Sequence, residues 1–368
     1  MDMDRTRALR ELPTPFDERP LLVIWETTQA CDLACVHCRA CAIANRDPAE
    51  LTTDEAKKLL DDVKRMGTPL FVLTGGDPAK RPDLVEIVRY GSSIGLIMAV
   101  TPSGTPLMTR NILGELRDAG MARLAVSVDG YDAAIHDAFR RVRGSFENTM
   151  RILEDARALG VERQINTTIT PHNKKDLRAM ADLVIRMGAT LWSVVTVVPT
   201  GRADAHMVLP PDDMEAMLVE LAGIAENAPF DVKTTAAPMF RRVVMERRAK
   251  VGPVGVLRDL DAEGHLRGPR GVNDGVGMLF VSHKGDVFPS GFLPLGTGNV
   301  RRDDVGAIYR DSPVFRSLRD VAALEGKCGA CPFKRVCGGA RSRAYATSGG
   351  NLHASDLACA YVPKGYVE

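Results

Sequence analysis

The sequence has few aromatic residues, almost no net charge and no long apolar stretch. Phe, Trp and Tyr make up 5% of its 368 residues, and 48 Lys and Arg nearly balance 47 Asp and Glu. A formal net charge of +1 gives no electrostatic reason to expect a nucleic acid or an anionic membrane as partner. Apolar runs such as Leu21–Trp25 fall far short of the roughly 20 residues that cross a bilayer. The first 15 residues lack the apolar core of a secretory signal, so we expect a cytoplasmic protein.

Cysteine is absent from the whole central part of the chain, between Cys41 and Cys328. The eight cysteines form two groups near the ends: Cys31, Cys35, Cys38 and Cys41, then Cys328, Cys331, Cys337 and Cys359. Cysteines that merely pack in a core would be spread along the sequence. Their clustering in a cytoplasmic protein therefore predicts metal ligation rather than disulfides.

Short apolar runs alternate with amphipathic stretches six times between Pro20 and Thr200. We expect strands at Leu21–Glu26, Leu70–Thr74, Ile97–Thr101, Arg123–Val128, Arg163–Ile169 and Leu191–Val198, and helices at Thr53–Met66, Pro82–Ile94, Thr109–Ala119, Phe146–Leu159 and Lys174–Met187. A glycine follows each helix, where a left-handed backbone is favoured. This alternation predicts an α/β fold, a partial (β/α)6 TIM-like barrel of parallel strands with crossover helices.

Four regions are expected along the chain. They are an N-terminal extension (1–19), the barrel (20–205), a helical segment and linker (206–277) and a C-terminal domain (278–368) that contains a β-hairpin of Met278–Ser282 and Asp286–Pro289. The regular alternation is predicted to stop after Arg202. Pro210–Ala225 reads as one more helix, and the basic stretch Arg241–Lys250 as a solvated helical face.

The first cysteine group has the spacing C-x3-C-x2-C, and it follows the first predicted strand. Three thiolates on one loop suit an iron–sulfur cube, because each binds one iron and the fourth iron stays open to another ligand. Cys41 does not fit the common ferredoxin spacing, so we expect it to be a bystander.

The run from Cys31 to Cys38, CDLACVHC, resembles the signature of the radical S-adenosylmethionine (SAM) enzymes. The series of six βα units resembles their partial barrel, so the likeness covers essentially the whole chain. It implies a [4Fe–4S] cluster held by three cysteines, whose open iron binds SAM. Reductive cleavage of SAM then gives a 5′-deoxyadenosyl radical that abstracts hydrogen from a substrate, while the protein binds and orients.

The same resemblance implies a set of SAM-binding residues on the loops that follow the strands. By this resemblance Gly75, Gly76 and Asp77 receive the amino group of SAM, and Ser127 and Asp129 contact its ribose or sulfonium region. Arg140 binds the SAM carboxylate, and His37 packs on the adenine.

The second cysteine group supplies four thiolates, which suit either tetrahedral zinc or a fully ligated [4Fe–4S] cluster. Its spacing resembles the SPASM/twitch extension of radical SAM enzymes, which holds auxiliary clusters. Two cysteine positions of the full pattern carry Ser290 and Arg341 instead, and a third, after Gly298-Asn299-Val300, is also missing. The resemblance thus implies one auxiliary [4Fe–4S] cluster on Cys328, Cys331, Cys337 and Cys359.

Segments such as Trp25–Thr28 and Pro289–Pro294 resemble the branch that contains haem-biosynthesis decarboxylases acting on tetrapyrrole propionates. That implies radical decarboxylation of a carboxylate-bearing small molecule, a tetrapyrrole propionate or a sugar acid, with an electron donor such as flavodoxin or ferredoxin. A carboxylate needs cationic partners. Candidates by position are Arg202, Lys233, Arg241, Arg242 and His283, although a plain surface charge is the more common role for each such residue.

Two other functions stay open. Peptide maturases of this superfamily often carry an N-terminal recognition domain, and about 19 residues before the first strand are too few for one. A non-catalytic iron–sulfur electron carrier is disfavoured by the turn at Gly75–Asp77 and by the open-iron spacing.

Overall fold

The computed structural model describes residues 16–251 and 271–367. Ten strands form one sheet in the order β10-β9-β8-β1-β2-β3-β4-β5-β6-β7. The strands from β8 through β1 to β7 run parallel to one another, whereas β9 pairs antiparallel with both β8 and β10. The strands are β1 (Leu22–Glu26), β2 (Leu70–Thr74), β3 (Ile97–Val100), β4 (Met121–Ser127), β5 (Glu162–Ile169), β6 (Leu191–Thr196), β7 (Asp231–Thr235), β8 (Met278–Val281), β9 (Asp286–Phe288) and β10 (Gly298–Asn299). The partial barrel is confirmed, with each of the six predicted strands in place.

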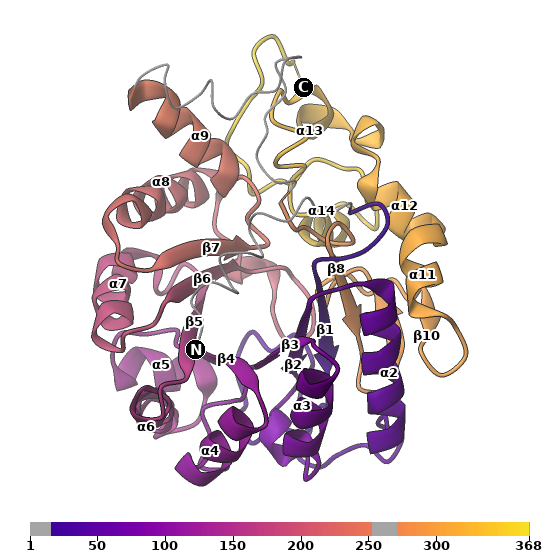
Figure 1. Ribbon diagram of the computed structural model, residues 1–368. Coiled ribbons are helices and arrows are strands. Elements are labelled where there is room, and N and C mark those ends of the chain that lie inside the picture. Colours follow the sequence, from indigo (N-terminus) through magenta and orange to yellow (C-terminus); the bar gives the residue numbers. More distant parts are fainter. Residues whose placement is uncertain (1–15, 252–270, 368) are drawn as a thin grey trace.

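The helices lie outside the curved sheet (Figure 1). Those of the barrel are α2 (Thr53–Met66), α3 (Leu84–Ser93), α4 (Arg110–Asp118), α5 (Ala133–Arg140), α6 (Ser145–Ala158), α7 (Leu177–Arg186) and α8 (Pro211–Asn227). Apolar residues on alternate strand positions, such as Trp25 and Trp192, pack against them in one core. The five predicted helix-ending glycines all have positive φ, between +60° and +96°.

Helix α2 begins with a capping box, and one prediction, the end of the barrel alternation after Arg202, needs correction. The N-cap of α2 is Thr52, whose side chain accepts from Glu55 N in a full capping box. The alternation does not stop after Arg202, because α8 leads into the seventh parallel strand, β7. The polar sequence of β7, Asp-Val-Lys-Thr-Thr, hid it from an apolar-run criterion. Helix α5, only eight residues long, was likewise not predicted.

The C-terminal part extends the same sheet. The hairpin of β8 and β9 forms as predicted, and β8 pairs with β1, so that the C-terminal part joins the sheet beside the first strand of the barrel (Figure 1). The remaining helices are α9 (Phe240–Val251), α11 (Val305–Asp311), α12 (Pro313–Arg319), α13 (Gly326–Ala330) and α14 (Arg341–Thr347). Among the described residues no helix has the length and apolar character needed to span a membrane.

The start of α9 differs from the solvated basic face predicted for it. Arg242 is only 3% exposed, and Arg241 donates to the carbonyls of Val336 and Val272, at 2.8 Å each. This end of the helix therefore packs against the C-terminal cysteine region instead of facing water. Most of the predicted linker, residues 252–270, lies outside the described residues.

Candidate functional site

The first cysteine group lies on the loop between β1 and α2, at the carboxyl end of the barrel strands. Backbone bonds fasten this loop to its surroundings: Cys31 N donates to Ile43 O at 2.8 Å, and Val36 N donates to Phe139 O at 3.0 Å. Cys35 is buried and Cys31 and Cys38 are half-buried, whereas Cys41 is exposed. The different exposure of Cys41 agrees with its predicted role as a bystander.

A polar pocket adjoins this loop. Its lining comes from the ends of four neighbouring strands and from α5: Leu33, Thr74, Gly75, Gly76, Thr101, Pro102, Ser103, Gly104, Ser127, His136, Arg140 and Ser145. Four of the predicted SAM-binding residues, Gly75, Gly76, Ser127 and Arg140, are thus brought together beside the cysteines. A concave site with several converging polar groups at the carboxyl ends of parallel strands can hold a small polar ligand.

The two glycines are required where the β2 loop meets the cysteine loop. A Cβ on Gly75 would lie 2.5 Å from Thr28 O, and one on Gly76 would lie 2.4 Å from Ala30 O. Gly76 N and Asp77 N donate to these same two carbonyls at 2.7 Å. Glycine therefore lets the two loops approach each other, which holds the pocket wall against the cysteines.

Asp77 is not among the residues that line the pocket, although its carboxylate accepts from the backbone N of Ser103, which is, at 3.3 Å. Its buried carboxylate accepts from Thr105 Oγ1 at 2.7 Å and from Ala79 N at 3.1 Å. Burial raises the pKa of this carboxyl, although these hydrogen bonds oppose the shift. In this geometry Asp77 stabilises the loop that follows β2. Its contact with a SAM amino group stays a prediction.

Arg140 links the pocket to the cysteine loop. It pairs with buried Asp129 at 2.5 Å and contacts Cys35 Sγ at 3.5 Å. Burial alone would raise the pKa of Asp129, but the Arg140 guanidinium holds it below the usual value. Among the described residues no acceptor reaches the buried Nε of Arg140, so this guanidinium still has a donor for an anionic ligand.

Two histidines near the pocket are neutral at physiological pH. Burial lowers the pKa of both His37 and His136 to about 4, and Arg140 adds to the effect. His37 stacks on Phe139 with ring centroids 4.5 Å apart, which fits packing rather than acid–base work. His136 was not predicted as a site residue. It accepts from Asp129 N and lies 3.3 Å from Ser145 Oγ, so it orders the wall of the pocket.

Ser103 was also missed as a site residue. Its hydroxyl lies 3.3 Å from Cys31 Sγ and donates to Gly76 O at 2.7 Å. Burial raises the pKa of the Cys31 thiol, and this hydroxyl is the largest influence that lowers it. The only sequence signal was its place in a polar loop after the third strand.

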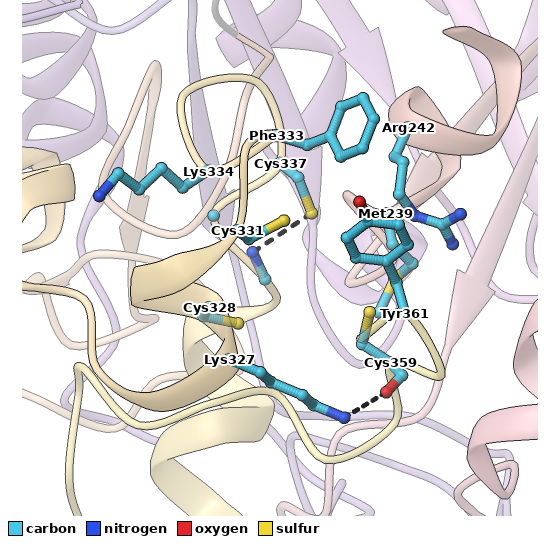
Figure 2. Close-up of a pocket in the computed structure, with 12 residues that line it drawn as sticks. Met239, Arg242, Lys327, Cys328, Cys331, Phe333, Lys334, Cys337, Cys359 and Tyr361 are labelled. Atoms are coloured by element: carbon cyan, nitrogen blue, oxygen red, sulfur yellow. Dashed lines mark hydrogen bonds between the residues drawn. The ribbon is translucent and has the colours of Figure 1, made fainter. Parts of the chain in front are cut away.

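The second cysteine group encloses a cavity of a different kind. All four cysteines line it, together with Met239, Arg242, Lys327, Phe333, Lys334, Gly338, Gly339 and Tyr361. Figure 2 shows the four sulfur atoms around one common space. Burial raises the pKa of Cys331 and Cys359, and that of Cys337 to about 12.

Hydrogen bonds from two lysine side chains connect the loops of this second site. Lys327 Nζ donates to Cys359 O at 2.5 Å (Figure 2), and Lys334 Nζ donates to Gly329 O at 2.8 Å. The described residues contain no set of three His, Cys, Asp or Glu side chains arranged to hold a metal ion. The convergence of four thiols on one cavity nevertheless fits a ligand larger than one ion, such as a cube with one iron for each thiol.

The residues at two missing cysteine positions are both buried and hydrogen-bonded. Arg341 donates to Leu352 O at 3.0 Å and to Ala354 O at 2.8 Å, and its guanidinium also lies 3.7 Å from Cys328 Sγ. Ser290 is buried too, and its hydroxyl accepts from Phe292 N at 3.2 Å. Both side chains stabilise their own loops, which agrees with one auxiliary site rather than two.

The five cationic residues proposed as carboxylate partners lie in different parts of the structure. Arg242 is buried and lines the cavity of the second cysteine group, and Arg241 is half-buried and donates to Val336 O nearby. His283 pairs with Glu26 at 3.0 Å. Arg202 and Lys233 stay exposed, and Lys233 has no hydrogen bond or ion pair with any described residue. Arg202 lies next to the first cysteine loop, where its backbone N donates to Cys38 O.

One buried ion pair joins the second cysteine site to the barrel. Arg343 pairs with Asp356 at 2.7 Å and donates to Thr196 Oγ1 at 3.0 Å and Ala236 O at 2.9 Å. Asp356 in turn accepts from Ala340 N, and its carbonyl accepts from Cys359 N. The pair thus fixes the loop that bears Cys359 against the ends of β6 and β7.

Residues 25–184 match the family model described as the Radical SAM superfamily. The chain is 39% identical over 344 residues to the AdoMet-dependent heme synthase of Methanosarcina barkeri, covering 94% of this chain and 97% of that protein. It is 28% identical to the Fe-coproporphyrin III synthase of the same organism, with coverages of 96% and 91%. The crystal structure of Streptococcus suis SuiB shares the fold, with a TM-score of 0.72 at 15% identity over 94% of this chain and 78% of that one.

Proposed function

The chain belongs to the radical SAM superfamily, and from that premise we propose that it oxidatively decarboxylates propionate side chains of an iron tetrapyrrole. As a member of the superfamily it is an enzyme that uses a [4Fe–4S] cluster and S-adenosylmethionine. The observation that carries the proposal is the polar pocket beside the cysteine loop, combined with 39% identity to a heme synthase across nearly the full length of both chains.

The first cysteine loop and the polar pocket would hold the two cofactors. Cys31, Cys35 and Cys38 would bind three irons, and the pocket beside them would bind SAM. When bound, this pair supplies a 5′-deoxyadenosyl radical. Arg140 would orient the SAM carboxylate with its free donor, while Gly75 and Gly76 allow the ligand to approach the backbone.

The reaction balances in atoms and electrons. A –CH2–CH2–COO⁻ side chain of the substrate would lose one hydrogen atom from the carbon β to its carboxylate. The bond to the carboxylate carbon then breaks, CO2 leaves, and the side chain becomes –CH=CH2 with release of one electron. A one-electron acceptor is therefore needed beside the substrate.

The second cysteine site would supply this one-electron acceptor. Cys328, Cys331, Cys337 and Cys359 would hold an auxiliary [4Fe–4S] cluster with every iron bound to a thiolate, and such a cluster supplies one-electron transfer. The link of Arg343 to the ends of β6 and β7 would keep it at a fixed position relative to the barrel. The electron that starts SAM cleavage would come from a flavodoxin or a ferredoxin.

The proposal is tested with anaerobically reconstituted enzyme, dithionite, SAM and iron coproporphyrin III. We expect 5′-deoxyadenosine together with a porphyrin that has lost CO2 and two hydrogens for each propionate converted. If 5′-deoxyadenosine forms while the porphyrin mass stays unchanged, the enzyme acts on another substrate, and a precursor peptide becomes the next candidate. If no 5′-deoxyadenosine forms, the chain is an electron carrier.

A further inference from the structure

Lys233 stands on the inner face of the barrel. Its neighbour Val232 packs against the core formed with the outer helices, so strand alternation turns Lys233 to the opposite face. The same alternation holds on β4, β5 and β6. There Val126, Ile165 and Val194 lie in the core with the outer helices, so the residues next to them in sequence face the barrel interior. Lys233 is therefore not a lysine on the outside of the barrel.

The sheet register connects Lys233 through one row of paired residues to Ser127 of the polar pocket. Ser127 pairs with Asn166, Asn166 with Ser193, and Ser193 with Lys233. Ser127 lines the pocket proposed for SAM. Three strand spacings of about 4.8 Å put Lys233 at most about 14 Å along the sheet from Ser127. A substrate whose reacting carbon lies at the pocket could reach Lys233 with a different group.

The positive charge of Lys233 is uncompensated. Within residues 16–251 and 271–367 its ammonium makes no hydrogen bond or ion pair. The nearby Arg123 already pairs with Glu162 at 2.5 Å. The surrounding protein, with a smaller contribution from Arg123, lowers the pKa of Lys233 to about 8, although the side chain stays accessible to water. Because it is accessible and has no acceptor of its own, its ammonium is available to an anionic ligand.

We propose that Lys233 is a carboxylate-binding subsite of the barrel interior, which holds an acidic group of the substrate away from the carbon that reacts. This inference rests on the proposed function, since it assumes a substrate with more than one carboxylate. Iron coproporphyrin, which carries several propionates around its ring, is such a molecule. Holding one propionate at Lys233 would orient another toward the SAM pocket.

Equilibrium binding of iron coproporphyrin III, followed by its absorbance, tests the inference on the reconstituted holoenzyme without a reductant. We expect Lys233→Met to weaken binding by about 10- to 100-fold, the effect of removing a charge-assisted hydrogen bond, and Lys233→Arg to restore most of the affinity. Lys175→Met, at an exposed lysine of the turn Lys174–Asp176, is the matched control and should bind as the wild type does.

A neutral probe separates charge recognition from a packing defect. The tetra-amide of iron coproporphyrin lacks carboxylates, so Lys233→Met should not weaken its binding. Iron content per chain checks that the variant is folded and loaded. Unchanged affinity of Lys233→Met for iron coproporphyrin III, or equal losses for the acid and the amide, would overturn the subsite. If the wild type binds no iron coproporphyrin, the proposed function falls and the subsite falls with it.

Discussion

The two cysteine sites differ in what surrounds them. The first has three thiols beside a polar pocket, with a serine hydroxyl at Cys31 and a guanidinium at Cys35. The second has four thiols that line their own cavity, with an aromatic and an aliphatic wall in Phe333 and Met239. A metal site with a pocket beside it can bind a second ligand. In a site enclosed by four thiols, protein ligands occupy every coordination position that is open to the outside.

We propose that this difference gives the two sites different roles. In this proposal the first site binds and activates a small molecule, and the second carries electrons. The links to the rest of the protein agree: Arg140 connects the first site to the pocket, and Arg343 connects the second to the ends of two barrel strands. Variants of each site should therefore fail at different steps.

Removing a thiol from the open site should have the most severe consequence. In Cys35→Ala we expect 5′-deoxyadenosine formation to fall to background, because one iron loses its ligand and the loop loses its contact with Arg140. Chromatographic assay of 5′-deoxyadenosine under dithionite measures it. Turnover at the wild-type rate would mean that the first site does not hold the SAM-cleaving cluster.

Removing a thiol from the enclosed site should separate radical formation from product formation. Cys337→Ala should still cleave SAM but should yield no vinyl product, since the electron released by the substrate has no acceptor. The measurement is the ratio of product to 5′-deoxyadenosine by mass spectrometry. A ratio equal to that of the wild type would show that the second site takes no part in the oxidation.

Arg140→Gln should give an intermediate effect. It removes a charge next to Cys35 and the partner of buried Asp129, and we expect SAM cleavage to slow by about 10- to 100-fold. Asn111→Ala, a change on the exposed face of α4, serves as control. A larger KM for SAM is the sign of lost carboxylate binding; an unchanged KM would argue for a role limited to the loop.

Cys41→Ser should have the smallest effect of the series. Cys41 is exposed and has a positive φ of 49°, and its thiol makes no contact that orders the loop in the described structure. Iron content and SAM cleavage should match those of the wild type. Loss of about four irons per chain, the content of one cube, would instead identify Cys41 as a ligand.

Periodic features made much of the barrel predictable from sequence. The strands that form its wall carry apolar residues on alternate or successive positions, and a glycine ends each predicted helix. β7 escaped because its inner face carries Asp231 and Lys233, so an inward polar face looked like a loop. Short-range patterns cannot distinguish a strand that lines a polar interior from a segment in water.

The site was predictable where residues are close in sequence. The cysteine spacing and the turn at Gly75–Gly76 identified the pocket wall, whereas His136 and Ser103 reach it through the fold alone. The same limit explains Arg241: its burial against Val336 depends on a contact between residues nearly a hundred positions apart. A charged residue in a basic run gives no local sign of such a partner.

The difference between the two sites is tested most directly by the response of each cluster to SAM. Two variants separate them, one with Cys31, Cys35 and Cys38 replaced by Ala, the other with Cys328, Cys331, Cys337 and Cys359 replaced. Each should retain about four irons per chain. In electron paramagnetic resonance of the reduced proteins, we predict that SAM shifts the signal of the cluster that remains at the first site and leaves that of the second unchanged. A SAM-dependent shift at the second site, or none at the first, would contradict the division between an open and an enclosed cluster.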